Sequence, residues 1–114
     1  MQLVIKDKTF NVKFGVRFVR ELDKAYPNEQ NGMKFGMALA TKIPELLGFD
    51  IAALSDVIYF GTVTESPRPS QVDVDEYIEN VEDIEKLFEN VLDELRESNS
   101  GKLFMNQIDK EVKG

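Results

Sequence analysis

Few residues in this 114-residue sequence have side chains that commonly perform catalysis. Histidine and cysteine are both absent, so the commonest general base, the strongest nucleophile and the usual zinc ligands are missing together. Carboxylates, hydroxyls and lysines remain, and no glycine-rich phosphate-binding motif occurs. The composition disfavours an enzyme, and we expect neither a cofactor nor a bound metal.

The best metal candidate is the pair Asp73 and Asp75, whose spacing resembles the start of a calcium loop. An EF-hand needs an oxygen ligand at its fifth position and glycine at its sixth, where this sequence has Tyr77 and Ile78. Acidic residues in a first helical turn interact favourably with the helix dipole, which is the interpretation we adopt. A magnesium-dependent hydrolase that uses carboxylates is the weakest of the alternatives.

Negative charge is concentrated in one segment. Residues 73–97 contain eleven Asp or Glu against one Lys and one Arg, a balance of −9 within a net charge of −7 for the chain. Because nucleic-acid backbones are bound by basic surfaces, direct nucleic-acid binding is disfavoured. The acidic segment is either a solvated face or a face that binds a protein, and the sequence leaves both interpretations open.

Two further groups of residues are candidates for protein contacts. A basic stripe with helical spacing, made of Arg17, Arg20 and Lys24, precedes the acidic segment. Glu21 can also pair with Arg17 within the same helix. Two methionines four residues apart offer flexible apolar side chains, which suit either a varied binding surface or a core. The candidate protein-binding residues are Arg17, Arg20, Lys24, Met33, Met37, Asp75, Glu79, Glu82, Glu89 and Asp93.

The elements that must position these residues begin with a β-hairpin over residues 2–14. Leu3 and Ile5 alternate with polar neighbours, Asp7 and Lys8 form a polar break, and alternation then resumes to residue 14. An isolated hairpin is marginal in water, so helices must cover its apolar side. The expected fold is therefore α+β, mainly α, with an N-terminal two-stranded β-hairpin packed on about five helices.

Helical spacing continues through residues 16–98. A first helix ends at Pro27, and a second runs from Phe35 toward Ile43, where Pro44 should kink or restart it. Asp50 is a candidate N-cap for an apolar, largely buried helix over residues 51–63.

The acidic segment is also helical by pattern. Ser70 with Asp73 predicts a capping box, and from Val74 onward the apolar residues keep to one face. Residues 80–83 are expected to divide the segment into two helices, and residues 98–101 to end the second. We assign residues 1–101 to a single domain and residues 102–114 to a C-terminal tail, expected to be flexible.

The sequence also favours an intracellular location. The N-terminus lacks the features of a secretory signal, and the most apolar stretch, residues 48–63, is too short to span a bilayer. The absence of cysteine fits a reducing cytosol. We expect neither export nor a membrane partner.

The order of these blocks resembles a known family. The hairpin and first helix (KTFNVKFGVRFVRELDK), the blocks GMKFGMALATKIPELL and DIAALSDVIYFGT, and the acidic helices RPSQVDVDEYIEN and EDIEKLFENVLDELRESN are similar to the tail assembly chaperones of long-tailed phages that infect Gram-positive bacteria. The similarity covers residues 3 to about 100. It consists of spaced apolar and acidic blocks, with no catalytic motif to carry over.

The resemblance implies an α+β fold and a non-catalytic role in the host cytoplasm. Such chaperones coat the aggregation-prone tape measure protein, keep it soluble, promote tail tube assembly around it and are absent from the finished virion. The family also implies head-to-tail self-association, and a longer frameshifted form that engages the tail tube protein. The main alternative is an acidic nucleic-acid mimic that inhibits a DNA-binding enzyme, which would explain the acidic helices but not the first 65 residues.

Overall fold

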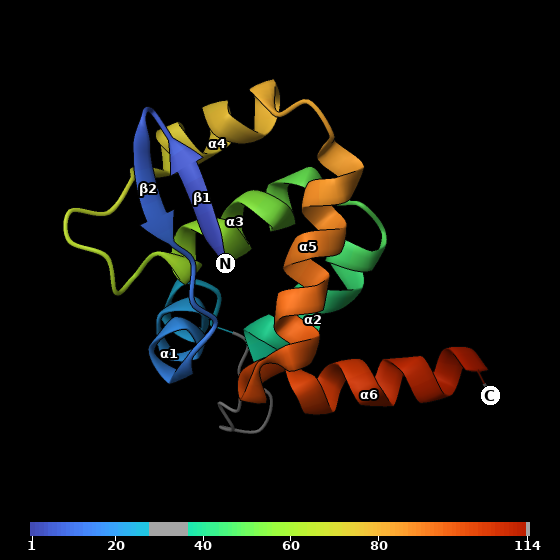
Figure 1. Cartoon of the computed structure of the whole chain (residues 1–114). Coiled ribbons are helices and arrows are strands. Elements are labelled where there is room, and N and C mark those ends of the chain that lie inside the picture. Colours follow the sequence, from blue (N-terminus) through green and yellow to red (C-terminus); the bar gives the residue numbers. More distant parts are fainter. Residues whose placement is uncertain (28–36, 114) are drawn as a thin grey trace.

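The computed structural model describes residues 1–27 and 37–113, which form one hairpin and six helices (Figure 1). The chain is α+β and mainly α, as the sequence predicts. The elements are β1 (Gln2–Ile5), β2 (Lys8–Asn11), α1 (Val16–Ala25), α2 (Met37–Leu47), α3 (Ile51–Gly61), α4 (Gln71–Asn80), α5 (Ile84–Glu97) and α6 (Asn99–Lys113).

The hairpin is antiparallel and turns one residue earlier than the polar break suggested. Lys6 and Asp7 form the turn, with φ angles of 50° and 64°. Two successive positive φ values are typical of the two-residue turn that matches strand twist. The register pairs Leu3 with Phe10, and both side chains are buried. The strands are shorter than the predicted 2–14, since β2 ends at Asn11.

Pro44 does not restart helix α2, which was one of the two outcomes expected for it. The helix continues to Leu47 although proline lacks the N–H that would bond to the preceding turn. Ile43 and Leu46 flank the proline and are fully buried in the core. Packing on both sides of Pro44 therefore outweighs its low helix propensity.

Two predicted helix starts are confirmed by their hydrogen bonds. The side chain of Asp50 accepts from the backbone N–H of Ala53 at 3.0 Å, which caps α3. Ser70 and Asp73 form the predicted capping box of α4. The break between α4 and α5 also lies where it was expected, and Asp83 caps α5.

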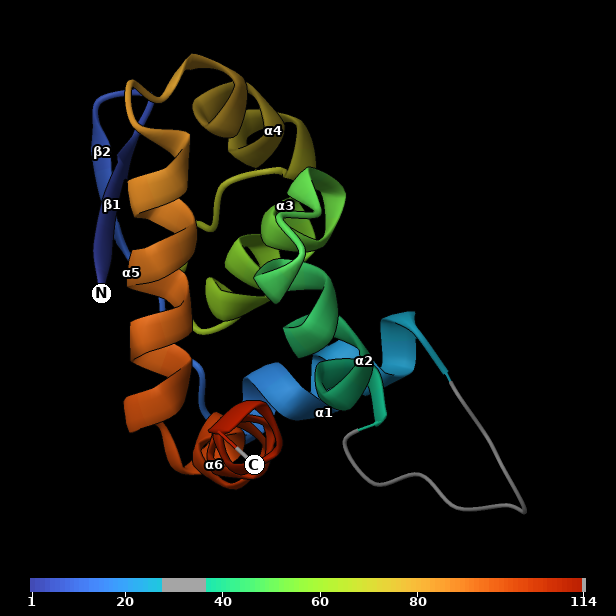
Figure 2. The ribbon, with the colours of Figure 1, turned by 90° about the vertical axis from the view of Figure 1, so that its right-hand side faces the viewer.

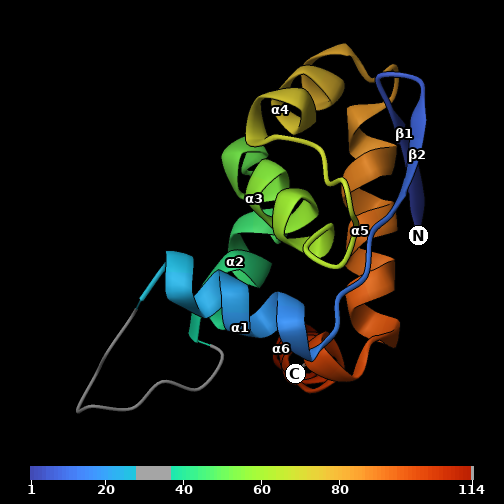
Figure 3. The same cartoon turned by 90° about the vertical axis from the view of Figure 1, so that its left-hand side faces the viewer.

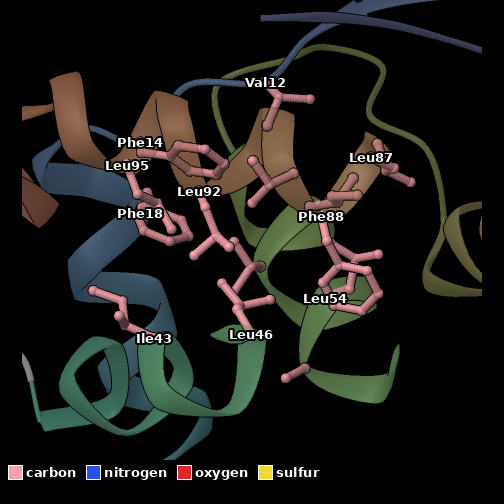
Figure 4. Packing of buried hydrophobic residues seen from close by; sticks show 14 of the residues in the cluster. Val12, Phe14, Phe18, Ile43, Leu46, Leu54, Leu87, Phe88, Leu92 and Leu95 are labelled. Atoms are coloured by element: carbon pink, nitrogen blue, oxygen red, sulfur yellow. The ribbon is translucent and has the colours of Figure 1, made fainter. Parts of the chain in front are cut away.

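The hairpin lies alongside α5, with α4 at one end of the molecule and α1 at the other (Figures 2 and 3). Helix α3 lies between α4 and α1 and contacts both, and its largely buried character agrees with the sequence prediction. Side chains from the hairpin exit, α1, α2, α3 and α5 meet in one core (Figure 4). Among them are Phe14, Phe18, Leu46, Leu54 and Leu92.

The C-terminal residues, which were assigned to a tail, are helical. Residues 102–113 belong to helix α6, which leaves α5 at a sharp corner and crosses the lower end of the molecule (Figure 1). Met105 is fully buried in the core, so α6 is packed rather than separate. Gly101 allows the close approach, because a Cβ atom there would lie 2.6 Å from the backbone oxygen of Leu95. Phe104 and Ile108 pack against the core beside Met105, at a helical spacing that the sequence analysis did not identify.

Candidate protein-binding surfaces

The basic stripe lies on the outer side of α1. Arg17, Arg20 and Lys24 are all exposed, while Phe18 and Leu22 on the opposite side of the helix are buried. Glu21 lies 3.4 Å from the Lys24 ammonium rather than pairing with Arg17 as expected. Exposed pairs of this kind contribute only ~0–1 kcal/mol, so the stripe remains available for contacts.

The acidic residues of α4 have different surroundings. Asp75 is half-buried and accepts a hydrogen bond from the hydroxyl of Ser55 on α3, so it ties two helices together. Glu79 and Glu82 are exposed, the first near the end of α4 and the second in the link to α5. The predicted set therefore divides into one structural carboxylate and two surface carboxylates.

Lys6 of the hairpin turn supplies an internal counter-charge for α4. Its ammonium lies 2.7 Å from the Asp73 carboxylate and 3.5 Å from Glu76. The hydrogen bond to Lys6 lowers the pKa of Asp73 below its usual 3.8. The same contact, with the Coulombic attraction of Asp73, raises the pKa of Lys6. These contacts come from the hairpin rather than from the basic stripe on α1.

The acidic residues of α5 form local pairs along the exposed side of the helix. Glu89 lies 3.8 Å from Lys86, and Asp93 lies 3.3 Å from Arg96. Both pairs are solvent-exposed, so they leave the surface strongly negative and add little stability.

Of the two methionines, Met33 lies outside the described residues. Met37 is the first residue of α2 and is half-buried.

The structure does not bring the basic stripe and the acidic residues of α4 together. Helices α1 and α4 lie at opposite ends of the molecule in two perpendicular views (Figures 1 and 3). The basic stripe and the acidic residues of α4 are therefore separated by the body of the fold.

An apolar hollow between the α2–α3 corner and the start of α5 was missed by the sequence analysis. It encloses about 390 Å³ and is lined by Phe49, Ile51, Ile84, Glu85 and Phe88. The Phe49 and Phe88 rings meet edge to face, with centroids 5.3 Å apart. One sequence signal could have indicated the hollow: Phe49 is a large apolar residue in the short link between the glycine that follows α2 and the aspartate that caps α3.

A buried charge pair joins α2 to α3. The Lys42 ammonium lies 3.1 Å from the Asp56 carboxylate and 4.1 Å from the centre of the Tyr26 ring. Burial, followed by the nearby Asp56 carboxylate, raises the pKa of Tyr26 to about 12. The Lys42 ammonium pairs with the Asp56 carboxylate and also contacts the Tyr26 ring, so we assign this cluster a structural role.

The described ranges, 1–27 and 37–113, contain no group of three or more acidic side chains placed to hold a metal ion. Within the same ranges, no helix is both long and apolar enough to cross a membrane.

The fold and these surfaces define a small, mainly helical protein whose notable exterior features are charged faces and one apolar hollow. The model of the family described as "Phage tail assembly chaperone protein, TAC" matches residues 2–110. The chain belongs to this phage tail assembly chaperone family. Comparison with curated proteins and with solved structures found no match.

Proposed function

We propose that this chain binds the tape measure protein of a long-tailed phage, keeps it soluble and promotes assembly of the tail tube around it. The observation that carries the proposal is the family match, which spans nearly the whole chain. A tape measure protein is long and helical, and its apolar seams must be covered reversibly until the tube encloses them. Exposed carboxylates on α4 and α5 would keep the loaded complex in solution.

The proposal places the protein in the cytoplasm of a Gram-positive host and outside the finished virion, with no catalytic step. A longer frameshifted form would engage the tail tube protein. Copies would associate head to tail, because unlike patches favour a heterologous contact whereas a symmetric contact brings like charges together. Basic α1 and acidic α4 at opposite ends of the subunit support this arrangement.

Co-expression with the tape measure protein encoded nearby tests the main proposal. We expect the tape measure protein to move from the insoluble to the soluble fraction and to co-purify with this chain. An unrelated acidic protein of similar size and charge is the control. A tape measure protein that stays insoluble with this chain in excess would refute the assignment.

Sedimentation velocity tests self-association. We expect oligomers larger than a dimer, weakened by salt and by a triple variant, Arg17→Glu, Arg20→Glu and Lys24→Glu. A strict monomer at high concentration, or an oligomer indifferent to salt and to charge reversal, would contradict the head-to-tail arrangement.

A further inference from the structure

Apolar side chains gather at the corner between α2 and α3. Leu47, Phe49 and Ile51 are all exposed within five residues, and Phe49 and Ile51 retain 59% and 52% of their accessible surface. The last two line the hollow together with Ile84 and Phe88 of α5. A clustered apolar surface of this kind is typical of an interaction site, whereas a single exposed apolar residue is ordinary.

The backbone at Phe49 makes an aromatic residue there costly. Helix α2 ends in a Schellman motif, with the Asp50 N–H bonding to the Glu45 carbonyl at 2.9 Å and the Phe49 N–H to the Leu46 carbonyl at 3.1 Å. Phe49 occupies the left-handed position of this motif, with φ of 61°, where glycine is usual. Its ring is largely exposed as well, and its edge-to-face contact with Phe88 leaves most of that apolar surface open to a partner.

The two segments that supply the lining of the hollow carry a net negative charge. Residues 47–51 and 82–89 together contain five Asp or Glu and one Lys, a balance of −4. Glu85 lines the hollow itself, and the single lysine, Lys86, already lies 3.8 Å from Glu89. A partner with apolar side chains and basic flanks would complement this surface, whereas an acidic peptide or a nucleic acid would be repelled.

We infer that this hollow binds an amphipathic helix of a tail protein, whose apolar side chains at helical spacing are flanked by Lys or Arg. The inference rests on the proposed chaperone function and adds where the client binds and what chemistry it has. An open apolar hollow flanked by charged residues suits a helix laid across it, with side chains three or four residues apart inserted as anchors. A volume of about 390 Å³ is enough for a few such side chains.

A pair of designed helical peptides tests the inference by fluorescence anisotropy. Both carry the same apolar stripe, but one is flanked by lysines and the other by glutamates. We expect the lysine-flanked peptide to bind at least tenfold more tightly, and its affinity to fall as salt is raised.

Two variants locate the binding on the protein. Phe49→Gly removes the ring and places glycine at a left-handed position, and Ile51→Ser removes an exposed side chain at the start of α3. Each should weaken binding of the lysine-flanked peptide at least tenfold. Leu103→Ala is the matched control, because Leu103 is 76% exposed on α6 and lies outside the hollow. Circular dichroism confirms that each variant is folded.

The possible results separate this inference from the proposed function. If wild type solubilises the tape measure protein and both hollow variants do so equally well, the chaperone role stands and the binding site is wrong. If neither peptide binds, or both bind equally, the basic amphipathic chemistry is wrong. If Phe49→Gly instead abolishes self-association and the peptide does not bind, the occupant is a second copy of the chain, which also overturns the inference.

Discussion

Glycine should stabilise the protein more than alanine at position 49, whereas alanine should stabilise it more than glycine at the neighbouring position 48. At position 49 the left-handed backbone costs any residue with a Cβ atom ~1–2 kcal/mol, which glycine avoids. Glycine loses ~0.5–1 kcal/mol through its greater freedom in the unfolded chain. Since Phe49→Gly and Phe49→Ala both remove the ring, their difference isolates these two effects. We expect the glycine variant to be more stable by about 1 kcal/mol.

Position 48 supplies the control, because Gly48 does not have a positive φ. A Cβ atom there would meet the carbonyl oxygens of Pro44 and Glu45 at 3.6 Å, an ordinary contact. Gly48→Ala should therefore raise the free energy of unfolding by ~0.4–1 kcal/mol.

Urea denaturation followed by circular dichroism measures both differences, and a change of 1 kcal/mol corresponds to roughly 4 °C in Tm for a domain of this size. If alanine is as stable as glycine at position 49, the backbone there is unstrained and the argument from Phe49 to a binding role fails. If alanine is destabilising at position 48, the helix end has a different geometry from the one described.

Three further predictions concern the core and the buried charge pair. Gly61→Ala should cost ~1–3 kcal/mol in urea denaturation, because its Cβ atom would lie 2.5 Å from a Val12 methyl group; an unchanged midpoint would contradict this packing. Lys42→Met should cost ~3 kcal/mol by leaving Asp56 buried without its cation, and adding Asp56→Leu should recover most of the loss. Tyr26 should ionise near pH 12, so its contribution to stability is present below pH 10.0 and is lost as pH rises toward 12. An ultraviolet titration compared with Tyr26→Phe checks this, and a tyrosine missing from the ordinary range near pH 10.0 is the expected sign.

Local signals predicted most of the fold. The caps at Asp50 and Ser70 have short side chains whose hydrogen-bonding partners lie three residues away, so the sequence contains the whole interaction. The hairpin was predictable for a similar reason, although its turn lies at Lys6 and Asp7 because two positive φ angles, rather than polarity, define it.

Predictions were less accurate where the structure depends on contacts between residues far apart in the sequence. Pro44 indicated a kink or a restart, and burial of Ile43 and Leu46 against other helices keeps α2 continuous across it. Phe104, Met105 and Ile108 stand at helical spacing, but so short an apolar stripe became interpretable only once the core that it contacts and the fit of Gly101 against Leu95 were known. The hollow around Phe49 joins residues more than 30 positions apart, so no local window contains it.

Because Lys42 is enclosed, the rate at which it can be chemically labelled measures how often α2 and α3 separate. Amine-reactive reagents modify lysines that are accessible and can lose a proton, and Lys42 is covered on one side by a carboxylate and on another by an aromatic ring. Exposed Lys86 on α5 would be modified directly, whereas Lys42 would react only when α2 and α3 separate. The ratio of the two labelling rates, read by peptide mass spectrometry, would therefore report how often this helix pair opens, both in the free protein and with a client bound.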